Sequence, residues 1–523
     1  MNVPNLAWGL PGARWSAPLE GLESFVETPP IDLLRQGAAI DPVATAIAGQ
    51  AGALDHATLL RQSQQVAAAL AARVPPGAAI ACLLPHRPDA IAGLLGCVIS
   101  GRVALVLNPL DPPERLRGLL AEAVPAAILA ATPPELPCAA PVLLLPDLLS
   151  GPVEDWRLDH AWSPDAPLTV HFTSGSTGRP KGIVLNARGL LARVLEVMQH
   201  WQLGPTDRVM VTSLPTTSSG MAFLLATLFS GARAVLTQLG LEGARAVLRL
   251  ALREGVTCAA AGPTLWRLLL QREEARASFA TLRLQRSGNS PVLAEDVAAW
   301  RAVLPPGCAL QHTFASTEAQ VIAQWRLPLE PLPPGPIPAG HAEPIHEMAL
   351  LDPDGAPVPP GEAGELTLRG PYLALGEWQA GRLVPGRMAA EPDRPGWRRF
   401  HTGDLARILP DGLVQMLGRA DRQVKINGVR VDPSEIEAIL RAEPGVTEAA
   451  VLALGAATRV TLHGFVAAPG QDAAALLPAL RRRLADALPS PFRPSTLEVL
   501  PDLPRLPANG KLDLVALRRM AGG

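Results

Sequence analysis

The sequence is short of aromatic residues, cysteines and net charge. Aromatic residues make up 4% of its 523 residues, and the formal net charge is −2 because 46 basic residues stand against 48 acidic ones. This balance gives no electrostatic footprint for nucleic acid or for an anionic membrane surface. The 5 cysteines lie far apart and form no C-x-x-C pair, so neither a disulfide framework nor a cysteine-based zinc site is expected.

Targeting and membrane-spanning signals are missing as well. The first residues do not combine a basic start with an apolar core, so no signal peptide is expected. The most apolar stretch, residues 221–229, is too short to cross a bilayer. We therefore expect a soluble cytoplasmic protein that binds neither nucleic acid nor membrane.

What is present is a large supply of core-forming residues in an alternating pattern. Hydrophobic residues make up 48% of the chain, and its length predicts two or more domains. Residues 1–50 are expected to be an irregular lead-in with one helix near 31–35. Apolar runs typical of buried strands then alternate with helical periodicity, which predicts βαβ units and a parallel sheet. The expected strands are 78–84, 103–107, 126–129, 208–213, 234–237 and 257–260, and the expected helices 58–73, 89–100, 113–123, 187–200, 219–230, 240–254 and 263–272.

The pattern changes near residue 340. Short strands at 345–351, 364–369, 407–409 and 413–416 are separated by turns such as Asp352-Pro353-Asp354-Gly355, which predicts an antiparallel β-subdomain over about 340–419. From residue 431 a small α+β pattern follows, with helices at 433–441 and 473–488 and strands at 446–454 and 460–467. The expected fold class is α/β, with large parallel sheets, an antiparallel subdomain and a small C-terminal α+β domain.

The segment 171–182, His-Phe-Thr-Ser-Gly-Ser-Thr-Gly-Arg-Pro-Lys-Gly, is the most informative stretch. Glycines let a loop turn its N–H groups inward, where they form a concavity for anions. Hydroxyls and one lysine add donors, so the loop suits a polyphosphate. A Walker A motif is excluded, because Arg179-Pro180 separates Gly178 from Lys181 and Gly182 follows the lysine. The candidate phosphate-binding residues are Thr173, Ser174, Gly175, Ser176, Thr177, Gly178 and Lys181.

This string resembles the phosphate-binding signature of the adenylate-forming superfamily, which includes acyl-CoA synthetases, luciferases and nonribosomal peptide synthetase adenylation domains. Segments resembling four further family motifs follow in family order, at 313–318, 400–405, 418–430 and 504–513. The resemblance covers nearly the whole chain and is closest to a free-standing adenylation domain. It implies an acid–thiol ligase that uses ATP and Mg²⁺.

Segment 313–318, Thr-Phe-Ala-Ser-Thr-Glu, resembles the family's aromatic-Gly-x-Thr-Glu motif. The resemblance implies that Phe314 lies on the adenine, that Thr317 contacts phosphate, and that Thr317 and Glu318 belong to the metal site. An oxygen ligand of this kind suits Mg²⁺. Ala315 replaces the usual glycine, which would tighten the space near the acyl carbonyl.

The remaining motifs imply ribose contacts and a mobile C-terminal domain. Asp404 and Arg419 match ribose-binding residues, and Arg430 matches one that reaches the phosphate. Asp421 matches the hinge, so the expected domains are 1–419 and 420–523. The resemblance implies catalytic roles for Lys511, Thr173, Glu318 and Lys425, with Lys511 serving the first half-reaction and the Lys425 face serving the second after the small domain rotates.

The implied reaction is attack of a carboxylate on the α-phosphate of ATP, release of pyrophosphate, and displacement of AMP by a thiol. In amino-acid-activating relatives an aspartate anchors the substrate ammonium, and that position aligns with Ser218. Serine supplies no charge, so an uncharged acyl or aryl acid is expected rather than an α-amino acid. The expected pocket residues are Ser218, Met221, Gly288, Asn289, Thr313, Val321 and Ile322.

The acceptor and the catalytic status stay open at this point. Because no carrier segment follows within the chain, the first expectation is transfer to the phosphopantetheine thiol of a separate carrier protein. Release to free CoA is the alternative. A non-catalytic member used for binding or scaffolding is a second alternative, which Ala315 and Asn427 favour and which Lys181, Glu318, Asp404 and Lys511 oppose.

Overall fold

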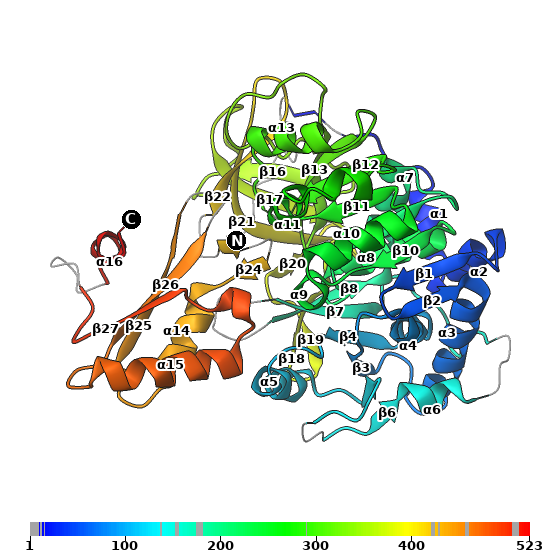
Figure 1. Ribbon diagram of the computed structural model, residues 1–523, viewed down its shortest axis with the longest axis horizontal. Coiled ribbons are helices and arrows are strands. Elements are labelled where there is room, and N and C mark those ends of the chain that lie inside the picture. The colour runs from blue at the N-terminus through cyan, green and yellow to red at the C-terminus, as the bar shows by residue number, and fades with distance from the viewer. Residues whose placement is uncertain are drawn as a thin grey trace.

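The computed structural model describes residues 10, 13–14, 16–135, 139–151, 156–173, 181–288, 290–419, 424–426, 429–455, 460–504 and 512–522. Across these ranges, the N-terminal four fifths of the chain form a large domain around two long sheets, and the remainder forms a small domain beside it (Figure 1). No helix among these residues is both long and apolar enough to cross a membrane.

The first long sheet is mainly parallel in its centre. Its order within the described ranges is β15 (His341–Ala342), β14 (Gln320–Arg326), β13 (Ala309–Ser316), β12 (Leu284–Gly288), β11 (Cys258–Ala261), β9 (Arg208–Val211), β10 (Arg233–Leu236), β1 (Thr45–Gly49) and β2 (Gly52–Asp55). Pairs from β13 through β1 are parallel, and the antiparallel pairs lie at the two edges.

The second long sheet has the order β19 (Arg382–Val384), β18 (Gly376–Gln379), β8 (Lys181–Asn186), β7 (Pro167–Thr173), β4 (Val103–Leu107), β3 (Ala79–Leu83), β5 (Ala127–Ala130) and β6 (Val142–Leu144). It is parallel from β7 to β6 and antiparallel at its other edge. A third, antiparallel sheet consists of β16 (Glu347–Leu351), β17 (Gly364–Gly370), β21 (Arg398–Ile408) and β20 (Met388–Ala390), and β22 (Val414–Arg419) also pairs with β21.

The largest hydrophobic core lies between the two long sheets. Side chains of β3, β4 and β5 from one sheet and of β1, β9 and β10 from the other belong to one buried cluster with the intervening helices. The helices of the large domain are α1 (Leu22–Glu27), α2 (Pro30–Ile40), α3 (His56–Ala71), α4 (Pro88–Ile99), α5 (Pro113–Ala123), α6 (Leu145–Leu149), α7 (Ala187–Trp201), α8 (Ser218–Phe229), α9 (Leu239–Glu242), α10 (Ala244–Glu254), α11 (Pro263–Leu270), α12 (Ala275–Ser278) and α13 (Ala294–Val303). Strands buried on both faces explain the continuous apolar runs of the sequence.

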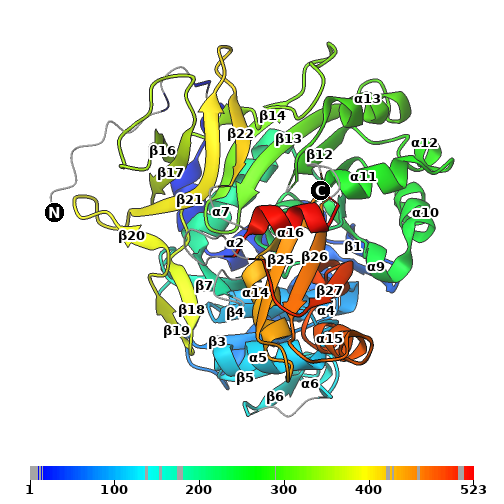
Figure 2. The same cartoon turned by 90° about the vertical axis from the view of Figure 1, so that its left-hand side faces the viewer.

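The small domain has its own core, made of residues from 424 onward. It contains the ribbon β23 (Val424–Ile426) and β24 (Val429–Val431), the sheet β25 (Glu448–Leu454), β26 (Thr461–Ala467) and β27 (Thr496–Leu500), the helices α14 (Pro433–Arg441), α15 (Ala473–Ala487) and α16 (Leu514–Met520), and the 3-10 turn η1 (Ser490–Phe492). α14 and α15 pack with one face of the sheet, and α16 packs with the other (Figure 2).

Three expectations from the sequence need correction. Residues 22–49 form two helices and a sheet strand, not an irregular lead-in. The helix expected at 240–254 is broken at Gly243, whose φ of 76° separates α9 from α10, because a positive φ ends a helix. Strands β18 and β19 leave the expected β-subdomain and extend the second long sheet, because β18 pairs with β8 and β19 pairs with β18.

Candidate active site

Two flanking residues of the glycine-rich segment lie opposite each other on neighbouring strands. Thr173 ends β7 and pairs with Lys181, the first residue of β8, and the Thr173 hydroxyl donates to the Lys181 carbonyl at 3.5 Å. Lys181 Nζ lies 3.4 Å from Oε1 of Glu377, whose side chain is buried. The sequence analysis missed Glu377; a lone glutamate inside the apolar segment 373–378 was its only signal. Ser174, Gly175, Ser176, Thr177 and Gly178 lie outside the described residues.

The segment around residue 375 connects this strand pair with the Glu318 turn. The Ala374 N–H donates to the Glu318 carbonyl at 2.8 Å, and the Leu375 N–H donates to the Val184 carbonyl at 2.8 Å. Glu377, two residues further on, holds Lys181. The motifs at 171–182 and 313–318 are separated by more than a hundred residues in sequence. Both are therefore bonded to the same short segment, 374–377.

The turn between β13 and β14 carries Thr317 and Glu318. The Ser316 hydroxyl accepts a hydrogen bond from the Ala319 N–H at 3.1 Å, and the Gln320 side-chain amide donates to the Thr317 carbonyl at 3.0 Å. Gln320 has a φ of 57°, which local hydrogen bonding makes tolerable. These bonds fix a tight hairpin turn, in which the Glu318 side chain is buried.

A single carboxylate at this turn fits a Mg²⁺ ion that is shared with substrate phosphates. Among the described residues there is no group of three or more His, Cys, Asp or Glu side chains that could hold a metal ion. Mg²⁺ is commonly held by one or two carboxylates together with phosphate oxygens and not by a complete protein cage. Glu318 and the neighbouring Thr317 are of the required chemistry.

The third and fourth motifs meet across two strands of the antiparallel sheet. Asp404 on β21 is the register partner of Arg419 on β22, and Arg419 Nη1 donates to Asp404 Oδ1 at 3.0 Å. Arg419 Nη2 also donates to the Thr402 carbonyl at 3.2 Å. Lys425 and Arg430 are register partners on β23 and β24. Asp421 and Lys511 lie outside the described residues.

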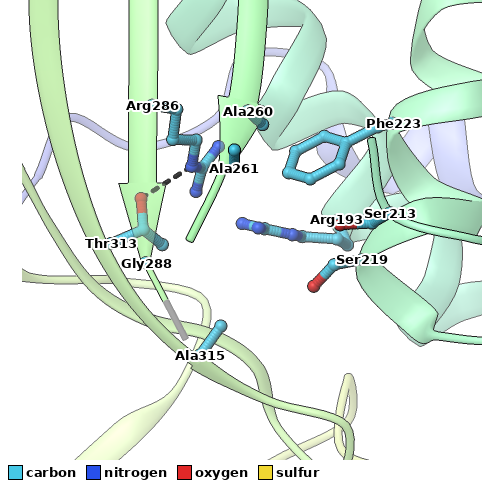
Figure 3. A pocket seen from close by; sticks show the side chains of 10 residues that line it. All are labelled: Arg193, Ser213, Ser219, Phe223, Ala260, Ala261, Arg286, Gly288, Thr313 and Ala315. Carbon is cyan, nitrogen blue, oxygen red and sulfur yellow. Dashed lines mark hydrogen bonds between the residues drawn. The ribbon is translucent and has the colours of Figure 1, made fainter. Parts of the chain in front are cut away.

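A cavity opens beside the same hairpin. It has an empty volume of about 340 Å³, which includes space open to solvent. Its lining comes from five neighbouring elements and one loop, and consists of Arg193, Ser213, Ser219, Phe223, Ala260, Ala261, Arg286, Gly288, Thr313 and Ala315 (Figure 3).

The cavity contains some of the expected pocket residues and omits others. Thr313 and Gly288 line it, and a Cβ on Gly288 would lie 2.5 Å from the Thr313 carbonyl oxygen, so glycine permits the close approach of β12 and β13. On α8 the lining residues are Ser219 and Phe223, which are four residues apart and share a helix face. The expected Ser218 and Met221 lie on other faces and are buried. Asn289 lies outside the described residues.

Val321 and Ile322 were also expected at the pocket, and here the structure corrects the prediction. Val321 belongs to the core between the long sheets, and Ile322 belongs to the core of the antiparallel sheet. Their strand, β14, folds back along β13, so its apolar side chains pack into the two cores and the cavity lining comes from β13.

Two buried arginines dominate the cavity, and the sequence analysis singled out neither. Arg193 projects from α7 and Arg286 from β12, and each side chain is 3% exposed. Figure 3 shows both guanidinium groups turned toward the space between Phe223, Thr313 and Ala315. In the sequence, the only sign of their role was that each is a charged residue within an otherwise apolar element, Arg193 in a helix and Arg286 in a strand.

These arginines share one carboxylate. Arg193 Nη1 donates to Glu196 Oε2 at 2.5 Å, and Arg286 Nη1 lies 3.2 Å from Glu196 Oε1. Burial opposes ionisation of Glu196, but the charges of Arg193 and Arg286 outweigh burial and hold its pKa well below the usual range. Burial lowers the pKa of Arg286 to about 10, which still leaves it charged at neutral pH.

Aromatic rings support the same cations. The Arg193 guanidinium lies 5.8 Å from the Phe223 ring centroid, and that of Arg286 lies 5.8 Å from Trp201 and 5.9 Å from Phe223. Ring faces attract cations and keep a desolvated guanidinium favourable. Arg286 Nε also donates to the Thr313 hydroxyl at 2.6 Å.

The two domains touch through a buried ion pair. Arg115 Nη1 on α5 lies 3.0 Å from Glu435 Oε1 on α14, with side chains 8% and 5% exposed. The Arg115 guanidinium also lies 5.9 Å from the Phe492 ring, and burial raises the pKa of Glu435. In Figure 1, α5 lies next to α15, which is consistent with their packing.

Known proteins share both the sequence pattern and the fold of this chain. Residues 34–378 match the model of the AMP-binding enzymes. The chain is 29% identical over 509 residues to the dimodular nonribosomal peptide synthase of Bacillus subtilis (strain 168), covering 93% of this chain and 20% of that protein. It is 30% identical over 516 residues to enterobactin synthase component F of Escherichia coli (strain K12), covering 93% of this chain and 39% of that protein. The chain thus spans well under half of these curated relatives.

The fold is also that of a solved structure. NpsA-ThdA, an artificially fused adenylation-PCP di-domain nonribosomal peptide synthetase from Klebsiella oxytoca, superposes with a TM-score of 0.77 at 20% identity, covering 90% of this chain and 93% of that one. The superposition confirms the expected fold class.

Proposed function

Because the chain belongs to the family of AMP-binding enzymes, in which it is an adenylate-forming ligase, we propose that it activates a carboxylic acid with ATP and passes the acyl group to a thiol. One observation supports this most strongly. The strand segment 374–377 bonds both to the Glu318 turn and to Lys181, while Thr313 and Ala315 of the strand leading into that turn line the cavity. The proposed phosphate-binding region and the cavity therefore adjoin.

The first half-reaction joins the acid to AMP. A carboxylate oxygen attacks the α-phosphorus of ATP, the bond from that phosphorus to the bridging oxygen breaks, and pyrophosphate leaves with the electron pair. In this proposal Thr173, Lys181 and the segment between them hold the β- and γ-phosphates, Phe314 lies on the adenine, and the charge that develops is met by Lys511. A Mg²⁺ ion held by Thr317 and Glu318 would neutralise phosphate charge.

Ribose binding and the second half-reaction follow the same assignment. Asp404 and Arg419 would contact the ribose hydroxyls, which a carboxylate with two oxygens can accept together, and Arg430 would contact the phosphate. Rotation at Asp421 would then present Lys425. A thiolate attacks the acyl carbonyl, the bond to the phosphate oxygen breaks, and AMP leaves. Such a rotation is a hinge motion between two domains.

The cavity supports an acid without an α-ammonium group. An ammonium buried without a counter-charge costs several kcal/mol. The α8 residues on the cavity, Ser219 and Phe223, carry no charge, and the carboxylate of Glu196 is already engaged by two arginines. The ammonium of a substrate would be repelled there.

For the acceptor we propose the phosphopantetheine thiol of a carrier protein. The support is the similarity to a nonribosomal peptide synthase, to an enterobactin synthase component and to an adenylation-PCP di-domain. Free CoA is the other candidate thiol. A thioester assay that supplies a phosphopantetheinylated carrier protein and CoA one at a time separates the two.

ATP–pyrophosphate exchange with a broad panel of acids tests the proposal. Acid-dependent exchange is expected with at least one acid and is expected to be lost without Mg²⁺. A well-folded protein that binds ATP but exchanges pyrophosphate with no acid would contradict the proposal and favour a binding or scaffold role.

A further inference from the structure

The cavity wall carries a guanidinium nitrogen that has no hydrogen-bond partner among the described residues. Arg286 Nη2 is buried and, among the residues that the structure describes, finds no acceptor, although Nε bonds Thr313 and Nη1 bonds Glu196. A buried donor left unsatisfied is costly, and buried polar groups are nearly always paired. Arg286 lines the cavity, so a ligand in that cavity is the natural acceptor.

The directly paired side chains around this nitrogen also include more positive than negative groups, which favours an anionic ligand. Arg193 and Arg286 carry two positive charges, and Glu196 supplies one negative charge. Glu343 is the other carboxylate of this cluster and reaches it through Gln324, whose side-chain amide donates to Glu343 Oε1 at 2.5 Å. Burial, together with the charge of Glu196, raises the pKa of Glu343, and among the described residues Glu343 forms no ion pair with either arginine.

His200 does not correct the imbalance. Its Nδ1 lies 3.2 Å from Glu196 Oε1. Burial lowers the pKa of His200, but the hydrogen bond and the charge of Glu196 outweigh burial and leave the pKa raised overall. Protonation of this ring adds positive charge. Within the described residues, two guanidinium groups therefore share one directly paired carboxylate, that of Glu196, beside the cavity.

We infer that the acid activated by this enzyme is a small dicarboxylic acid, whose second carboxylate binds Arg193 and Arg286 in the cavity wall. This inference rests on the proposed adenylation function. A guanidinium presents N–H donors in a planar fork that matches a carboxylate. An apolar acyl chain in the same place would leave the excess charge buried and unpaired, which is strongly unfavourable.

The geometry also limits the length of the acid. Thr313, which bonds Arg286, and Ala315, nearer the Glu318 turn, are two residues apart on β13, a spacing of about 7 Å along a strand. The reacting carboxylate belongs at the Ala315 end and the second one at the arginine end. A spacer of a few carbon atoms spans that distance, and Ala315 narrows the cavity further.

Pyrophosphate exchange with matched acids tests the inference. The panel contains straight-chain dicarboxylic acids from malonate to adipate, the monoamide of each, the monocarboxylic acid of each chain length, and unrelated aryl and amino acids. At least one dicarboxylic acid is expected to exceed both its monoamide and its monocarboxylic partner roughly tenfold or more in kcat/KM. Equal use of the monoamide, or preference for monocarboxylic or aryl acids, would overturn the inference and leave the adenylation function standing.

Variants of the cavity arginines distinguish a loss of acid binding from a loss of folding. Arg286→Met is expected to lower kcat/KM for the dicarboxylic acid at least tenfold and to raise the relative use of the monocarboxylic acid of equal length. Arg249→Gln, which removes an exposed arginine of α10, is the control and is expected to change neither. If Arg286→Met is poorly folded, Arg193→Gln and the substrate comparison in the wild type decide the question. Exchange with no acid of any class would contradict the adenylation function itself, and the inference with it.

Discussion

Replacing Glu196 by glutamine should destabilise the large domain by several kcal/mol. The carboxylate is fully buried, 2.5 Å from Arg193 and 3.2 Å from both Arg286 and His200. At an effective dielectric constant of about 20, each arginine at about 3 Å contributes roughly 5 kcal/mol of attraction, most of which offsets desolvation. Removing one partner of a buried ion pair costs about 3–5 kcal/mol, because the remaining charge stays buried. Here two guanidinium groups would be left facing each other.

Denaturant unfolding of the variant, followed through tryptophan fluorescence, measures this effect. Glu273→Gln removes an exposed carboxylate on the same domain and should change stability by no more than about 0.5 kcal/mol. A loss for Glu196→Gln within about 1 kcal/mol of that control would refute the reasoning. A dicarboxylic acid that restores part of the lost stability would link the effect to the cavity.

The same pair of proteins has an expected pH dependence. The folded-state pKa of Glu196 is depressed, so its stabilising contribution is complete above the pKa of an unfolded glutamate, near 4.3. That contribution is lost as the pH falls toward the folded-state pKa. The stability difference between wild type and Glu196→Gln should therefore be largest at neutral pH and shrink in acid. Most of the loss should occur below about pH 4, the unfolded value. A difference that stays constant from pH 7 down to about pH 2 would show that the charge is not its cause.

Three further variants test the domain arrangement and the catalytic assignments. Lys511→Ala should reduce pyrophosphate exchange by about 3–4 kcal/mol of transition-state stabilisation while transfer from supplied acyl-adenylate continues; exchange within about tenfold of wild type would remove the assignment. Asp421→Pro fixes φ at the expected hinge, so thioester formation should fall while exchange survives, and equal loss of both would show that the hinge lies elsewhere. Glu435→Gln breaks the buried contact to Arg115, so it should change the ratio of the two half-reaction rates and speed proteolysis between the domains. The control is Glu114→Gln, which breaks an exposed ion pair on α5. Identical behaviour of the two variants would show that the buried contact does not hold the domains together.

Local signals in the sequence defined many elements closely. Strand 103–107 and helices 113–123 and 433–441 have the same bounds in the structure. A proline opens each of these helices, and proline at the first helical position is a strong boundary signal. The glycine at 243 was a signal too, but glycine within a helical pattern is often tolerated, so its positive φ and the break it causes followed only from the fold.

In the candidate site, too, some features could be predicted from the sequence and others followed only from the fold. The motifs predicted Thr173, Lys181, Thr317, Glu318, Asp404 and Arg419 as members of one site, because each motif is contiguous in sequence. The structure describes bonds that link Thr173, Lys181 and the Glu318 turn, and a separate bond between Asp404 and Arg419. Glu377 belongs to no motif and meets Lys181 only because β18 pairs with β8.

The sequence by itself determined the family resemblance, the alternation of strands and helices and the class of reaction, because each is written in residues that are close together along the chain. Only the tertiary structure decided the character of the acid cavity. Arg193 and Arg286 are far apart in sequence, and each resembles an isolated charge in an apolar element. Folding places both beside a single buried carboxylate. Because charges in a dry interior interact strongly and require partners, their meeting is the basis of the proposed preference for a dicarboxylic acid.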